Sequence, residues 1–215
     1  MTSRRLSTRP PLHLPLTACL VLSAAACAFG NRHPNLHYPP AGEPQGPVAV
    51  VTLSPEAPAV AVRVTDMRQG SRTTVGEVRN GFGMHTADVE IQQDPVVWVK
   101  EALERELTVQ GFRVVQAEGE SGLLSSELVA LHCDAYLSYA AEVSLRVEFK
   151  TGQTAIPPVV YVGHGSAGVN MAASEDSYSE SLALALQDAA RQVAAQLRWA
   201  LTQPGRPPPG ARPSS

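Results

Sequence analysis

The sequence is poor in charge, in aromatic side chains and in cysteine. Charged residues make up 17 % of the 215 residues, aromatic residues 5 %, and cysteine occurs three times. The 17 basic residues are outnumbered by 20 acidic ones, and this balance argues against a nucleic-acid-binding protein, which needs a basic surplus. The composition also excludes a collagen, a coiled-coil rod and a multi-pass membrane protein.

The remaining composition fits one globular domain with appendages. Hydrophobic residues make up 44 %, close to the globular average, so that a core can form. The 18 prolines and 16 glycines are somewhat numerous but fall short of a disordered chain. A length of 215 residues leaves room for one domain of ordinary size.

The N-terminus has the three parts of a bacterial secretory signal. Three arginines and no acidic residue occur in residues 1–10, an apolar stretch covers residues 12–26, and small residues precede Cys27. The apolar stretch is short, follows Pro11 and is interrupted by His13 and Pro15, so it is a poor membrane span. We therefore interpret residues 1–26 as a cleaved signal peptide of the lipoprotein type.

Small residues directly before Cys27 resemble the lipobox of bacterial lipoproteins, in which the cysteine becomes the first mature residue and carries acyl groups. Ala24 stands where that motif usually has leucine, and Cys19 has a better match in letters but too little apolar sequence before it. The alternative is an ordinary secreted protein that is cut near Ala26. Lipidated Cys27 would attach the protein to a membrane, and Ala28, which is not aspartate, favours sorting to the outer membrane, facing the periplasm.

Loss of residues 1–26 removes three arginines and no acid, which leaves 14 basic against 20 acidic residues, a formal charge of −6. Such a domain is not drawn to anionic headgroups, so membrane attachment would depend on the acyl chains. With Cys19 in the signal and Cys27 lipidated, Cys133 is left without a disulfide partner, and we expect it to be a small buried residue.

Two proline-rich segments flank the predicted domain at residues 59–203. Residues 27–58 contain seven prolines and predict an extended tether, whose first twenty residues could span roughly 60 Å as polyproline II. Residues 204–215 contain five prolines and no aliphatic side chain larger than alanine, which predicts a disordered tail.

Within 59–203 the hydrophobic pattern predicts strands and two helices. Alternation around residues 60–64, 129–137 and 143–149 is typical of strands with one buried face, and shorter strands are expected at 73–79, 87–91, 112–115 and 159–162. Asp94-Pro95 predicts the start of a helix that ends at Gly111.

The second helix is expected to begin near Ser177, where Ser177-x-x-Glu180 has the form of a capping box, and to end before Pro204. Gly163–Gly168 should loosen the strand that precedes it. These patterns predict an α+β fold: a mainly antiparallel sheet with the two helices packed on one face.

Several residues, in their order and spacing over about 48–201, resemble the YajG family of largely uncharacterised bacterial lipoproteins. They are Val62-x-Val64-x-Asp66-x-Arg68, Val75-Gly76-x-Val78-Arg79-Asn80-x-x-Gly83, Asp94-Pro95, Leu107-x-x-x-Gly111-Phe112-x-Val114 and Tyr178-x-x-x-Leu182-x-x-Ala185-Leu186. The resemblance implies an envelope lipoprotein and supplies no reaction, ligand or catalytic residue.

The glycine-rich stretch Gly76–Gly83 favours a hairpin turn over a phosphate-binding loop, because no helix and no Gly-Lys-Ser/Thr follow it. Arg79, Phe82, Met84 and His85 gather there. A cation and an aromatic side chain on a glycine-rich loop suit contact with a partner, so these four residues form the candidate interaction loop.

Candidate catalytic and metal residues are few. His164 and Ser166 suggest a serine hydrolase, but His164 stands where the motif needs glycine. A helix should also begin at the serine, whereas glycine and Asn170 follow it. His132 and Asp134 supply half a metal site on one strand face, and His33-x-x-x-His37 lies in the proline-rich segment. We therefore predict no cofactor and no metal.

The sequence is best interpreted as a non-enzymatic, membrane-anchored envelope lipoprotein whose domain contacts an envelope protein or component. An envelope hydrolase that uses Ser166 with His164, or His132 with Asp134, is the alternative, as is a binder of a small apolar ligand between sheet and helices. The partner and the oligomeric state are not encoded in any recognisable motif.

Overall fold

The computed structural model describes most of the predicted domain and part of the segment before it. The described residues are 30–43, 57–80, 82–116, 122–152, 155–169 and 174–202. The predicted signal peptide, Cys27 and the C-terminal tail lie outside them.

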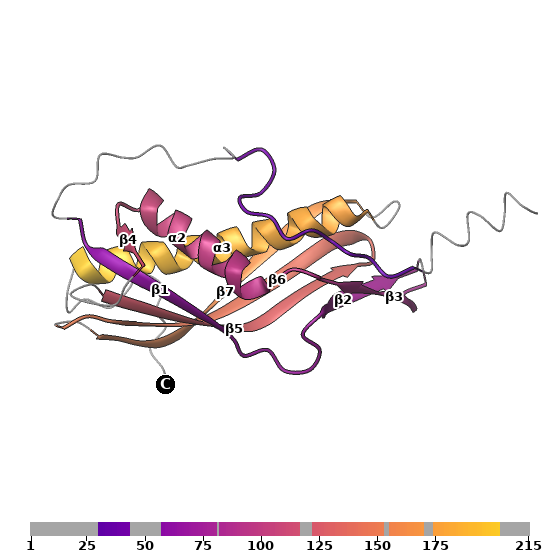
Figure 1. Ribbon diagram of the computed structural model, residues 1–215. Coiled ribbons are helices and arrows are strands. Elements are labelled where there is room, and N and C mark those ends of the chain that lie inside the picture. The colour runs from indigo at the N-terminus through magenta and orange to yellow at the C-terminus, as the bar shows by residue number, and fades with distance from the viewer. Residues whose placement is uncertain are drawn as a thin grey trace, which may run out of the picture.

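Seven strands and two helices make up the described chain (Figure 1). In chain order they are β1 (Ala59–Asp66), β2 (Thr74–Arg79), β3 (His85–Glu90), α2 (Pro95–Val109), β4 (Arg113–Val115), β5 (Gly122–Ala135), β6 (Ser138–Lys150), β7 (Ala155–Val169) and α3 (Glu175–Thr202).

The sheet is mixed, so the expectation of a mainly antiparallel sheet is wrong. β1 pairs in parallel with β4 on one side and with β5 on the other, and β5, β6 and β7 follow each other as antiparallel neighbours. A parallel pair needs a long crossover, which here is the β2–β3 hairpin followed by α2. Alternation in a sequence shows which face of a strand is buried and carries no information on strand direction.

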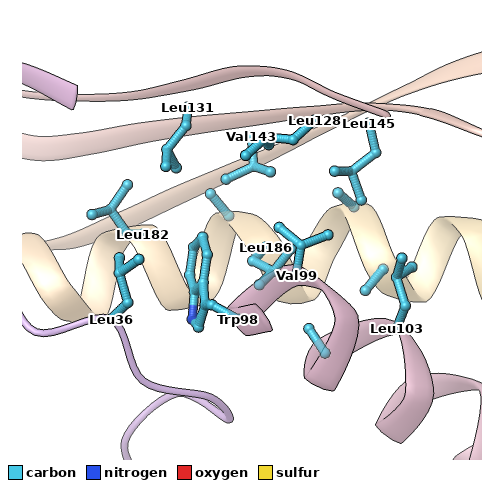
Figure 2. Close-up of a cluster of buried hydrophobic side chains, with 14 of the residues drawn as sticks. Leu36, Trp98, Val99, Leu103, Leu128, Leu131, Val143, Leu145, Leu182 and Leu186 are labelled. Carbon is cyan, nitrogen blue, oxygen red and sulfur yellow. The ribbon is translucent and has the colours of Figure 1, made fainter. Parts of the chain in front are cut away.

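Both helices lie on the same side of the sheet, which gives the α+β arrangement (Figure 1). α3 packs on β6 and β7, and α2 packs on β1 and on α3. Figure 2 shows side chains from the sheet, α2 and α3 meeting in one core. The sheet contributes Leu128, Leu131, Val143 and Leu145, α2 contributes Trp98, Val99 and Leu103, and α3 contributes Leu182 and Leu186, all of them buried.

The start of α2 is confirmed, and α3 starts within two residues of the expected position but without the expected capping box. Asp94 accepts a hydrogen bond from the amide of Val96 at 2.8 Å, and Gly111 follows the helix with a φ of 87°. α3 begins at Glu175, so Ser177 lies inside its first turn and the predicted capping box is wrong. Two acidic residues, Glu175 and Asp176, lie in that turn, where negative charge complements the helix dipole.

β7 continues through the glycines that were expected to loosen it. A side chain at Gly163 would place its Cβ 2.1 Å from the carbonyl oxygen of Ala185, and one at Gly165 would lie 2.0 Å from that of Ser181. Both glycines therefore let the backbone of α3 rest directly on β7. They are packing residues of an unbroken strand.

Cys133 is fully buried on β5, as expected, with its Sγ 3.1 Å from the hydroxyl of Ser181. Burial raises the pKa of its thiol to about 12. A thiol that stays protonated and enclosed is a packing group.

Residues 30–43 pack against the domain, which differs from an extended tether over 27–58. Leu36 is buried beside Trp98 and Leu182 (Figure 2). The indole Nε1 of Trp98 donates to the carbonyl of His37 at 2.8 Å, and the hydroxyl of Tyr38 donates to Glu106 at 2.6 Å. The tether was predicted from the prolines alone, whereas Leu36 and Tyr38 attach this segment to the domain.

Candidate interaction surface

The β2–β3 turn, which contains Phe82 and Met84 of the predicted interaction loop, is stabilised by the side chain of Asn80. Its Oδ1 accepts hydrogen bonds from the amides of Phe82 at 3.0 Å and Met84 at 3.1 Å. The amide of Gly83 donates to the carbonyl of Asn80 at 2.8 Å, and Gly83 has a φ of 79°, which favours glycine. The predicted hairpin is thus present, and its turn is well bonded.

Two large apolar side chains of this turn are exposed to solvent. Phe82 is 89 % exposed and Met84 is 59 % exposed. Turns are usually built from small polar residues, so apolar side chains that gain nothing from the fold need another explanation.

A second turn, between β5 and β6, brings two more apolar residues to the same place. Tyr136 is 43 % exposed and Leu137 is 70 % exposed. β2 meets β5 where Val78 pairs with Ala135, so the two turns follow directly from neighbouring strands. A Cβ at Gly83 would lie 3.9 Å from the ring of Tyr136. We call Phe82, Met84, Tyr136 and Leu137 the apolar tip.

The sequence did not reveal the second half of the apolar tip. Leu137 continues the apolar alternation of residues 129–137 and was therefore expected to face the core, but β5 ends at Ala135 and Leu137 lies in the turn. Contact between the two turns depends on the β2–β5 pairing, for which the sequence has no local signal.

The two charged members of the predicted loop lie at the base of the hairpin and are paired. Arg79 lies 2.7 Å from the carboxylate of Glu77, and Nε2 of His85 lies 3.0 Å from that of Asp88. Each pair links a strand residue to a neighbour on its own strand. The base of the hairpin is thus polar, and its tip is apolar.

The residues of the hydrolase alternative lie within a regular strand. Ser166 pairs with Ala140 and His164 with Glu142 in the middle of the β6–β7 ladder. The backbone amide of His164 donates to Asp188 of α3 at 3.1 Å. A nucleophile elbow places its serine on a sharp turn between strand and helix, and Ser166 has no such position.

The sheet face opposite the helices carries a row of polar side chains. Register places His132, Glu142 and His164 next to each other on β5, β6 and β7, and Nε2 of His132 lies 3.0 Å from the carboxylate of Asp134. Among the described residues, no group of three or more histidine, cysteine or acidic side chains is arranged to hold a metal ion. The arrangement is a solvated polar face.

Between the sheet and α3, the described residues leave a small hollow. This hollow, among Leu124, Phe149, Tyr161 and Leu197, has a volume of about 10 Å³, which is room for roughly one water molecule. An apolar ligand of ordinary size does not fit into this hollow.

Neither α2 nor α3 offers a stretch long and apolar enough to cross a membrane, within the part of the chain that the structure describes.

No family model matches the sequence, and no curated protein matches it. Solved structures with a similar arrangement include a protein from Xanthomonas campestris described under DUF330, with a TM-score of 0.48 and 11 % identity over 80 % of this chain and 97 % of that one. A hypothetical protein from Chlamydia trachomatis has a TM-score of 0.47 and 12 % identity, with coverages of 66 % and 96 %. A minor lipoprotein from Acinetobacter baumannii has a TM-score of 0.40 and 12 % identity, with coverages of 65 % and 90 %. At these values the similarity carries no argument about function.

Proposed function

We propose that this chain is a membrane-anchored envelope lipoprotein with acyl groups on Cys27. Its domain has no enzymatic activity and contacts an envelope component through the apolar tip. In this proposal the protein belongs to the outer membrane and faces the periplasm.

The apolar tip is the observation that carries the proposal. Four large apolar side chains, between 43 % and 89 % exposed, lie on two adjacent turns. Their exposure lowers solubility and adds nothing to the packing of the core. Exposed apolar patches of this kind mark sites of contact with another surface. The signal-like N-terminus and the small residues before Cys27 support an envelope location.

Intact-mass measurement of protein extracted from membranes tests the anchor. The wild-type chain should begin at Cys27, carry the added mass of acyl groups and partition into detergent. Cys27→Ala should be uncleaved or free of lipid. The matched control is Cys19→Ala, which removes the other cysteine of the signal and should leave processing unchanged. A wild-type protein without acyl groups in the aqueous phase contradicts the proposal.

A further inference from the structure

The described chain begins beside the hairpin that carries half of the apolar tip (Figure 1). Arg32 forms a parallel bridge with Val89: its amide donates to the carbonyl of Asp88 at 2.9 Å, and the amide of Glu90 donates to its carbonyl at 2.8 Å. The amide of Asp88 also donates to the side chain of Asn31 at 3.3 Å. Because this bridge is parallel, the chain comes to Arg32 from the hairpin end of β3.

Few residues separate this point from the proposed lipid anchor. Gly30 is the first described residue, and Cys27 precedes it by three positions. Three residues span at most about 11 Å between Cα atoms even when fully extended. Acyl groups on Cys27 would thus hold the hairpin end of the domain close to the bilayer, in place of the roughly 60 Å reach of a free tether.

We propose that the apolar tip inserts into the interface of the same membrane that holds the acyl groups. This inference rests on the proposed lipidation of Cys27 and names the envelope component that the tip contacts. The tip is a second membrane contact, and together with the anchor it fixes the orientation of the domain on the bilayer.

The chemistry of the tip fits a lipid interface. Phe82, Met84 and Leu137 are side chains that enter the boundary between headgroups and acyl chains, and Tyr136 is of the type found at headgroup level. The basic side chain of Arg79 is already paired with Glu77, and His85 is bonded to Asp88. Attraction is therefore apolar, which suits a mature chain with an excess of acidic residues.

The position of the tip favours a bilayer over a protein as its occupant. Half of the tip, Phe82 and Met84, belongs to the strand pair that Arg32 joins, so the tip and the proposed anchor lie at the same end of the domain. Multiple acyl chains already supply stable attachment. The tip therefore orients the domain on the bilayer and adds little to the affinity of the protein for the membrane.

Depth-dependent quenching in vesicles tests the inference. Phe82→Cys adds one accessible thiol, because Cys27 would be acylated and Cys133 is buried. The lipidated full-length variant is labelled with an environment-sensitive fluorophore and reconstituted into phosphatidylethanolamine–phosphatidylglycerol vesicles with brominated acyl chains. A label held about 5–10 Å deep should lose about half of its fluorescence relative to vesicles without bromine.

The matched control is Val109→Cys with the same label. Val109 is also apolar and 47 % exposed, but it lies at the C-terminal end of α2, next to β4 at the opposite end of the domain (Figure 1). Its label should show no quenching. Met84→Ser with Leu137→Ser, added to the labelled Phe82→Cys chain, should reduce the quenching, and an unchanged circular dichroism spectrum shows that the fold is intact.

The outcomes separate the two proposals. Protein that floats with the vesicles while both labels stay unquenched overturns membrane insertion of the tip and leaves the anchor standing. Protein that does not float overturns the anchor itself. A photocrosslinker at position 82 that captures a protein in intact membranes, and no lipid, also overturns the inference and assigns the tip to a protein partner.

Discussion

Asp66, at the end of β1, shows how a single residue fastens the chain where it leaves the sheet. Its carboxylate accepts hydrogen bonds from Nε and Nη2 of Arg68 at 3.0 and 2.9 Å and lies 2.9 Å from Arg72. Partial burial on its own would raise the pKa of Asp66, but the hydrogen bonds from the two arginines outweigh it and lower the pKa to about 2. Asp66 and Arg68 thus form an ion pair, and the arginine is itself buried.

Asp66→Asn should therefore destabilise the domain in a pH-dependent way. A carboxyl group whose pKa is lower in the folded chain stabilises it above the unfolded pKa of about 3.9, and this contribution disappears as the pH falls towards 2. We expect a loss of about 2 kcal/mol in the free energy of unfolding at pH 7, and a shrinking difference from wild type between pH 5 and pH 2. Urea unfolding at a series of pH values measures it.

The matched control is Glu77→Gln at the exposed pair with Arg79. Both side chains are 40 % exposed, and exposed ion pairs contribute about 0–1 kcal/mol. A control that loses as much stability as Asp66→Asn, or a difference that does not depend on pH, contradicts this account of Asp66.

At the scale of elements, the contact between α3 and β7 depends on two glycines. Gly163→Ala or Gly165→Ala would place a methyl group inside the helix backbone, because the nearest atoms are at 2.1 and 2.0 Å and belong to the main chain. Overpacking of this kind costs about 1–3 kcal/mol or more. We expect either variant to unfold at markedly lower urea concentration or to be insoluble.

Gly152→Ala serves as the control for these glycine variants. No heavy atom lies within 4 Å of a Cβ at Gly152, and its φ is not in the left-handed region. Its midpoint of urea unfolding should stay close to that of wild type. Equal tolerance of alanine at 152, 163 and 165 would show that α3 does not rest on β7.

The two helix starts offer a second prediction at the element scale. Asp94→Ala removes the acceptor for the amide of Val96 and should cost about 1 kcal/mol. Ser177→Ala should change stability by less than about 0.5 kcal/mol, because Ser177 follows the helix start and does not cap it. Thermal unfolding of both variants checks the pair. A larger loss of stability for Ser177→Ala would show that Ser177 caps the helix after all.

At the scale of the whole molecule, residues 30–43 contact both helices. The hydroxyl of Tyr38 donates to Glu106, which is 4 % exposed and also lies 3.5 Å from Arg191. Burial and the carboxylate of Glu106 raise the pKa of Tyr38, so its phenol remains a donor. Tyr38→Phe deprives a buried carboxylate of a hydrogen bond and should cost about 1.5–3 kcal/mol.

Hydrogen exchange distinguishes local detachment of this segment from general destabilisation. In Tyr38→Phe combined with Leu36→Ala, the amides of Arg32 and Glu90, which bond across the bridge to β3, should exchange faster. The amide of Leu145, inside the sheet, should keep most of its protection. Uniform loss of protection at all three amides would mean that the segment folds and unfolds with the core.

Much of this architecture follows from local sequence, and the rest depends on contacts between distant residues. Alternation located β5 and β6, and Asp94-Pro95 and Gly111 located both ends of α2, because these signals act within a few residues. The parallel pairing of β1, the attachment of Leu36 to the core and the meeting of the two turns at Gly83 are set by pairing across the fold. The role of the glycines in β7 was predicted wrongly, because glycine occurs both where a strand is loose and where another backbone approaches it closely.

The outer edge of β7 is interrupted at several positions. Pro157 and Pro158 offer no amide hydrogen, and further along the strand Gln192 donates to the carbonyl of Val162 at 3.0 Å while Asp188 accepts from the amide of His164. A strand edge interrupted in this way is a poor template for a strand from a neighbouring copy. Molecules packed side by side in two dimensions could therefore remain separate without polymerising through their sheets.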